Sequence, residues 1–129
     1  MKSYILDTNF CLRFLLRDNV NQFRISESYI KKAKENKIAL ILYTEVIFEI
    51  EYVLSKVYKI NRDIICNHLL KMCRDDHLIV PERDVIIDSL ISYSKTKSDI
   101  ADCLLFHRSQ KLNAEVLTFD KHFSQLKKV

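Results

Sequence analysis

Glycine is absent from this chain of 129 residues, and proline occurs only once. Without glycine the sequence has no phosphate-binding loop of the P-loop or dinucleotide type, because both kinds of loop depend on glycines at fixed positions. Helix ends must then use other residues. Asn36 and Asn113 stand where left-handed C-terminal caps are wanted, and asparagine tolerates that conformation next best after glycine. The missing glycine therefore excludes two large nucleotide-binding classes.

Long apolar runs and metal-type cysteine motifs are also lacking. No run approaches the roughly 20 residues that a membrane-spanning helix needs. The N-terminus leads directly into an expected strand, so we expect no signal peptide, no membrane partner and a cytoplasmic protein. The cysteines show no CxxC spacing and no paired histidines, which predicts buried free thiols. They are Cys11, Cys66, Cys73 and Cys103.

Apolar runs of strand length alternate with stretches of helical period along the whole chain. The expected strands cover residues 4–6, 38–42, 77–80 and 115–118, and the first is expected to be buried on both faces. The expected helices cover residues 9–17, 22–35, 45–58, 62–73, 84–93 and 99–111, with a weak helix or tail over 121–129. This alternation predicts one α/β domain, residues 1–129. It would be a three-layer α/β/α domain with a mainly parallel sheet of four or five strands.

Polar residues at the starts of the expected helices are suited to be N-caps. Thr44 precedes the helix that follows the second strand, and Asn61 precedes the next helix. Ser98 or Asp99 would cap the helix that runs to Lys111. Each of these side chains can accept a hydrogen bond from a free backbone N–H of the first helical turn.

Acidic residues recur after the expected strands and at the starts of helices. Asp102 has the least favourable environment of these acids, because it lies inside an apolar stripe. An unpaired carboxylate there must be neutralised by a proton, a basic partner or a metal ion. No Lys or Arg is interleaved at the matching strand ends, and Mg²⁺ or Mn²⁺ prefers oxygen ligands. The pattern favours metal-assisted phosphodiester hydrolysis. The acidic residues are Asp7, Glu45, Glu49, Asp99, Asp102 and Asp120.

Four of these acids also have an interpretation that needs no function. Asp7, Asp99 and Asp120 could simply cap helices, and Glu45 could simply be a favourable acid in a first helical turn. Structural roles fit Asp102 poorly, since it sits in an apolar stripe.

Four stretches, in order along nearly the whole chain, resemble the PIN-domain ribonucleases. Within that family the likeness is to VapC-like toxins of bacterial toxin–antitoxin pairs. The stretches are YILDTN at 4–9, EVIFEIEYVL at 45–54, SDIADCLL at 98–105 and LTFDK at 117–121. The resemblance implies a divalent-metal-dependent endoribonuclease that hydrolyses RNA phosphodiester bonds. It further implies a cognate antitoxin protein as partner and a homodimer.

The same resemblance implies a site that holds Mg²⁺ or Mn²⁺. Its four catalytic acids would be Asp7, Glu49, Asp102 and Asp120, and Asp99 would be an accessory metal ligand. Thr8, Asn9 and Thr118 would support the site through hydrogen bonds. Spacing alone allows either Glu45 or Glu49 as the second acid, and the pattern after Glu49 favours that residue.

Rival functions are a phospho-acceptor domain of the receiver type and a non-catalytic PIN-like scaffold that binds RNA or protein. The receiver type wants an acidic pair beside the first strand and a lone Asp after the central strand, whereas here the first strand offers Asp7 alone and the third ends at Val80-Pro81. An Asp-x-Asp phosphatase is excluded because Thr8 and Asn9 follow Asp7. The scaffold remains the alternative, although a scaffold has no reason to keep buried like charges together.

Overall fold

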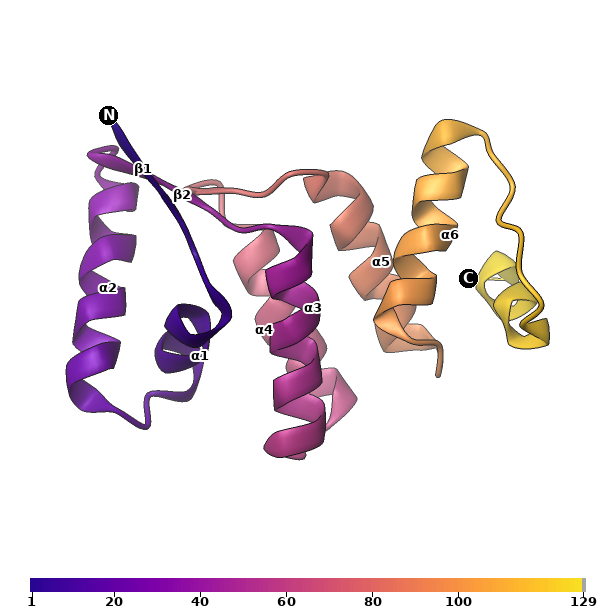
Figure 1. Ribbon diagram of the computed structural model, residues 1–129, viewed down its shortest axis with the longest axis horizontal. Coiled ribbons are helices and arrows are strands. Elements are labelled where there is room, and N and C mark those ends of the chain that lie inside the picture. The colour runs from indigo at the N-terminus through magenta and orange to yellow at the C-terminus, as the bar shows by residue number, and fades with distance from the viewer. Residues whose placement is uncertain (129) are drawn as a thin grey trace.

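The computed structural model describes residues 1–128, so the expected terminal helix or tail, 121–129, extends one residue beyond the described part. Figure 1 shows two short strands beside the N-terminal helices, with the later helices following one another across the molecule. The elements in order are β1 Lys2–Ile5, α1 Thr8–Leu16, α2 Val20–Lys34, β2 Ile38–Ile41, α3 Thr44–Tyr52, a π-helical turn η1 Val53–Val57, α4 Arg62–Cys73, β3 Leu78–Ile79, α5 Arg83–Lys95, α6 Ile100–Leu112 and a 3₁₀ helix η2 Lys121–Lys128.

The sheet of the described chain has three strands in the order β1-β2-β3, and both pairings are parallel. Helices connect the strands, as parallel neighbours require. The predicted α/β class and parallel sheet are confirmed. The predicted number of strands is wrong, because three form where four or five were expected.

The two faces of the sheet differ in burial, so the prediction that the first strand is buried on both faces is wrong. Leu40 and Leu78 are paired neighbours on β2 and β3, and both point into the core. Side chains alternate along a strand, so Ile5 and Ile79 lie on the opposite face, where they are 66% and 49% exposed. The core therefore covers one face of the sheet.

The expected fourth strand, residues 115–118, does not form, and the chain there is irregular. Leu117 is 94% exposed. A strand exists only by pairing with a neighbour, and local contacts give this segment another path. Asn113 turns the chain off α6, and Phe123 of η2 packs edge-to-face against Phe106 of α6. The segment therefore follows α6 and makes no ladder with the sheet.

The predicted helix starts are partly confirmed. Asn61 caps α4, since its side-chain oxygen accepts a hydrogen bond from the N–H of Ile64 at 3.1 Å. Thr44 is not a cap: it is the first residue of α3, and Tyr43 occupies the cap position without a side-chain bond. Asp99 is the cap residue of α6 by position, also without a side-chain bond. The expected helix over 45–58 divides into α3 and η1, whose wider turns begin at Val53.

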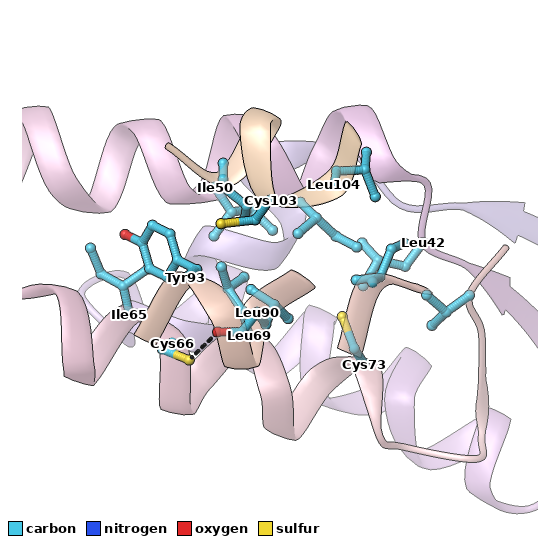
Figure 2. Close-up of a cluster of buried hydrophobic side chains, with 14 of the residues drawn as sticks. Leu42, Ile50, Ile65, Cys66, Leu69, Cys73, Leu90, Tyr93, Cys103 and Leu104 are labelled. Carbon is cyan, nitrogen blue, oxygen red and sulfur yellow. Dashed lines mark hydrogen bonds between the residues drawn. The ribbon is translucent and has the colours of Figure 1, made fainter. Parts of the chain in front are cut away.

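One continuous apolar core runs from α1, α2 and the sheet through the helices α3 to α6 to η2, and Figure 2 shows part of it. The prediction of four free, buried cysteines is confirmed. Burial is the main cause that raises the pKa of Cys11 and Cys73 to about 12 and of Cys103 to about 11. These thiols stay protonated at neutral pH, so they act as small apolar core residues, not as nucleophiles or metal ligands.

The lack of glycine places other residues in left-handed conformations. Asn36 and Asn113 have φ of 59° and 51°, as the sequence predicts. Lys59 reaches φ 53° without the tolerance that asparagine has for this region. No helix of the described residues is long and apolar enough to cross a membrane.

We expect Lys59→Gly to raise the free energy of unfolding by about 0.5–1 kcal/mol. Removing the Cβ relieves about 1–2 kcal/mol of left-handed strain, which exceeds the roughly 0.5–1 kcal/mol lost to the freer unfolded chain. Urea unfolding followed by circular dichroism measures the change. Lys59→Ala is the control, because it removes the exposed amine and keeps the Cβ. A glycine variant no more stable than the alanine variant would show that the turn carries no strain.

Candidate active site

Asp7 lies two residues after the end of β1 and is the cap residue before α1. Its Oδ1 accepts a hydrogen bond from the N–H of Phe10 at 2.8 Å, so the side chain is an N-cap. The carboxylate is exposed, and its neighbour Thr8 is buried while Asn9 is exposed. A cap occupies one lone pair of one oxygen. Capping is therefore compatible with a further role for Asp7 at this end of the sheet.

Three other predicted acids gather around the start of α6. Asp99 and Asp102 face the same depression of about 380 Å³, and Asp120 borders it from the chain that precedes η2. Burial raises the pKa of Asp102 above its ordinary value, and the negative charges of Asp99 and Asp120 raise it further. The structure thus brings like charges together at Asp102, the half-buried acid that the sequence places in an apolar stripe.

Local hydrogen bonds set the position of Asp120. Its N–H donates to the Thr118 hydroxyl at 3.0 Å, and its Oδ1 accepts from the N–H of His122 at 2.9 Å. The first bond closes a tight turn, and the second fixes the carboxylate at the start of η2. Asp120 therefore follows a turn, where the sequence predicted the end of a strand.

The two glutamates of α3 are both exposed, but their surroundings differ. The charge of Glu45 contributes to the raised pKa of Arg108, whose main partner is Glu82. Arg108 donates to both carboxylate oxygens of Glu82, at 2.9 and 2.6 Å. Glu45 thus lies near a cation, although neither glutamate forms an ion pair among the described residues.

The structure does not gather all the predicted acids into one cluster. Asp7 stands before α1 and Glu49 on α3, while the other three lie around α6 and η2, which Figure 1 shows at the far side from α1. Within residues 1–128, no group of three or more His, Cys, Asp or Glu side chains is close enough to hold a metal ion. The carboxylates around α6 still offer the oxygen donors that a hard divalent cation prefers.

Sequence reasoning missed three residues that line the same depression, namely Lys97, His122 and Gln125. Lys97 lies two residues before Asp99, in a polar linker where no pattern in the sequence distinguishes it from its neighbours. The other two belong to η2, and they reach the site because that short helix folds back onto α6. No periodic pattern in the sequence signals this return.

Basic residues near Asp7 are already engaged within the protein. Arg13 donates to both carboxylate oxygens of Asp18 at 2.9 and 3.0 Å. Arg17 lies over the ring of Phe23, with its guanidinium carbon 4.8 Å from the ring centroid. The first helix therefore presents no unpaired arginine pair to a phosphate backbone.

Comparison with known proteins identifies the family of this chain. The chain is 27% identical over 123 residues to a protein named VapC ribonuclease from Aquifex aeolicus (strain VF5), which covers 95% of this chain and 90% of the relative. No solved structure matches. A family model described as PIN domain matches residues 4–129. Because that match spans nearly the whole chain, the protein belongs to the PIN domain family.

Proposed function

We propose that this chain is a divalent-metal-dependent endoribonuclease, the toxin of a toxin–antitoxin pair. The observation that carries the proposal is the gathering of Asp99, Asp102 and Asp120 around one depression, where burial and mutual repulsion raise the pKa of Asp102. Repelling carboxylates at a surface hollow are suited to a cation. The name of the relative, a VapC ribonuclease, supports RNA as the substrate.

The oxygen-only donor set fits Mg²⁺ or Mn²⁺ better than softer metals. The residues that would hold the ion are Asp7, Glu49, Asp99, Asp102 and Asp120. When bound, the ion would lower the pKa of a water and offset the charge of the phosphate. Asp7 and Glu49 do not join the other acids in one metal-binding cluster of the described residues, so their part in holding the ion is proposed from the family resemblance and not from their positions.

The chain's own groups would then act as follows. Asp102, held half-buried on α6, would keep its carboxylate oriented toward the ion. Thr118 would hold Asp120 through the bond to its N–H. Thr8 and Asn9 would support Asp7 at the end of β1. Lys97, at the rim of the depression, would meet the phosphate backbone of the RNA.

Partners follow from the same proposal. A ribonuclease toxin needs an antitoxin that binds over its active site and inhibits it. We propose such a protein as the partner. We also propose a homodimer, and we expect the protein to act in the cytoplasm, where its RNA substrate lies. The alternative function is a PIN-like scaffold that binds RNA or protein without cleaving it, and it predicts metal-independent RNA binding.

Asp102→Asn tests the nuclease directly. We expect the rate of RNA cleavage in Mg²⁺ or Mn²⁺ to fall about 100-fold or more, as when one group that stabilises transition-state charge is removed. Gel analysis of end-labelled RNA measures the rate. The matched control is Asp63→Asn, which removes an acid from the first turn of another helix, α4. Equal cleavage by the Asp102 variant and the wild type would contradict the proposed site.

Asp102→Asn should also stabilise the metal-free protein. A carboxyl whose pKa is raised on folding binds its proton more tightly when folded, so its contribution to stability is lost as pH rises above the ordinary value of 3.8. In EDTA at pH 7 we expect a higher Tm for the variant, with the difference vanishing at pH 3. Mg²⁺ should raise the Tm of the wild type more than that of the variant. Thermal unfolding followed by circular dichroism checks this, and a lower Tm for the variant would rule out the repulsion.

Glu49→Gln and Glu45→Gln separate the two candidates for the second acid. Because the charge of Glu45 acts on Arg108, we expect its loss to change cleavage less than about threefold. Loss of Glu49 should lower cleavage about tenfold or more, the range seen when groups that orient a metal site are removed. The comparison uses kcat/KM on a defined RNA. A larger effect from Glu45→Gln would assign that residue to the site instead.

A further inference from the structure

Arg62, the first residue of α4, is half-buried and holds the main chain of two other segments. Its Nε donates to the carbonyl oxygen of Tyr93 on α5 at 2.7 Å. Its Nη2 donates to the carbonyl oxygen of Ser98, in the linker before α6. The guanidinium carbon also lies over the Tyr93 ring, 3.7 Å from the ring centroid. One side chain thus joins the starts of α4 and α6 to the end of α5.

Tyr93 extends this connection to α3. Its ring is buried, at 2% exposure, and lies beside Ile65 in the core (Figure 2). Its hydroxyl donates to Oε2 of Glu51 at 2.9 Å. Burial, with the acceptor and charge of Glu51, raises the pKa of Tyr93, so the hydroxyl stays a donor at any working pH. Glu51 lies two residues after Glu49 on the same helix.

The carbonyl that Arg62 holds belongs to the peptide group whose N–H is on Asp99. The rest of the linker is ordered as well: the Thr96 hydroxyl donates to the carbonyl of Ser92 at 2.9 Å, and the N–H of Ser98 donates to the Thr96 oxygen at 3.2 Å. Peptide groups are planar, so fixing this carbonyl fixes the direction in which the chain enters α6. Asp99 and Asp102 lie in that first turn.

Arg62 fixes the Ser98–Asp99 peptide without forming an ion pair with Asp99 or Asp102. None of the ion pairs among the described side chains involves it, and its hydrogen-bond acceptors are neutral carbonyls. Its positive charge lies at the start of α6, because its Nη2 donates to the Ser98 carbonyl just before that helix. A cation paired directly with Asp99 or Asp102 would compete with a metal ion. A cation held on main-chain carbonyls orders the same turn and leaves the carboxylates free.

We propose that Arg62 is a positioning residue of the nuclease site: it holds the Ser98–Asp99 peptide in place, with Tyr93 and Glu51 fixing the guanidinium. The role rests on the proposed function, because it gives a purpose to the placement of Asp99 and Asp102. It also links α3 to α6, the helices that carry Glu49 and Asp102. Groups that orient metal ligands from behind typically change metal affinity or activity by about 10- to 100-fold when removed.

Arg83 provides a matched control from the same chain. It is half-buried at the first position of α5, and it donates to the main-chain carbonyls of Cys73, Asp75 and Leu78. It therefore orders the approach to β3 much as Arg62 orders the approach to α6. Its three acceptors lie outside the acidic depression. Arg83→Lys should weaken folding without touching the acids.

The test compares Arg62→Lys with Arg83→Lys in the full chain. Lysine keeps the charge but cannot stack flat and donate to two carbonyls at once. We expect Arg62→Lys to weaken Mn²⁺ binding about tenfold or more, measured by electron paramagnetic resonance of the free ion, with faster amide exchange at residues 96–102 in metal-free protein. Cleavage should recover partly at high Mg²⁺. Arg83→Lys should keep wild-type Mn²⁺ affinity and exchange at 96–102.

A milder variant guards against a misfolded protein. Tyr93→Phe keeps the ring beneath Arg62 and removes only the hydroxyl bound to Glu51, so it should show the same shifts in smaller measure. Wild-type Mn²⁺ affinity in both Arg62→Lys and Tyr93→Phe, in a wild type that binds Mn²⁺ and cleaves RNA, would overturn the positioning role alone. So would equal weakening by Arg62→Lys and Arg83→Lys. A wild type that neither binds Mn²⁺ nor cleaves RNA would overturn the proposed function and this role together.

Discussion

Repulsion among like charges is the constraint around which this end of the molecule is built. Asp99, Asp102 and Asp120 border one depression, and the raised pKa of Asp102 records the free energy needed to keep them there. Packing elsewhere has to offset that cost. The stabilising contacts are those between α5 and α6 and those of Phe106 with Phe123, which hold η2 against α6. A cation placed among the carboxylates would turn the repulsion into attraction, which is why we link the site to metal binding.

Two half-buried arginines hold connecting segments of this chain through main-chain carbonyls. Arg62 does so before α6 and Arg83 does so between α4 and β3, each with donors to more than one carbonyl. A planar guanidinium suits this task, since its donors diverge in fixed directions. With no glycine in the sequence, the linkers cannot rely on left-handed glycine turns. These side chains supply part of the order that such turns would otherwise provide.

The sequence correctly predicted the features that depend mainly on neighbouring residues. The cap at Asn61, the left-handed turns at Asn36 and Asn113 and the burial of the cysteines depend on nearby residues and on apolar pattern. The spacing of three between Asp99 and Asp102 also placed both acids at the start of one helix correctly. Such inferences need no knowledge of which segments meet in space.

Long-range pairing is where the sequence was insufficient. The run 115–118 has the composition of a strand, yet contacts between η2 and α6 give it an irregular path. Ile5 looked like a core residue because its neighbours are apolar, but the face of the sheet on which it lies is open. His122 entered the acidic depression through the same return of η2. Each of these outcomes depends on how distant segments meet, and no short pattern encodes that.

The most direct test of metal-dependent cleavage is to incubate the purified chain with labelled total RNA, in Mg²⁺ or Mn²⁺ and in EDTA, beside an Asp7→Asn variant. Asparagine accepts the N-cap bond about as well as aspartate, so the variant keeps α1 and loses only the charge. We expect cleavage by the wild type in metal, none in EDTA, and a severe loss in the variant. RNA left intact under every metal, by a folded chain free of partners, would contradict the nuclease and favour the binding scaffold.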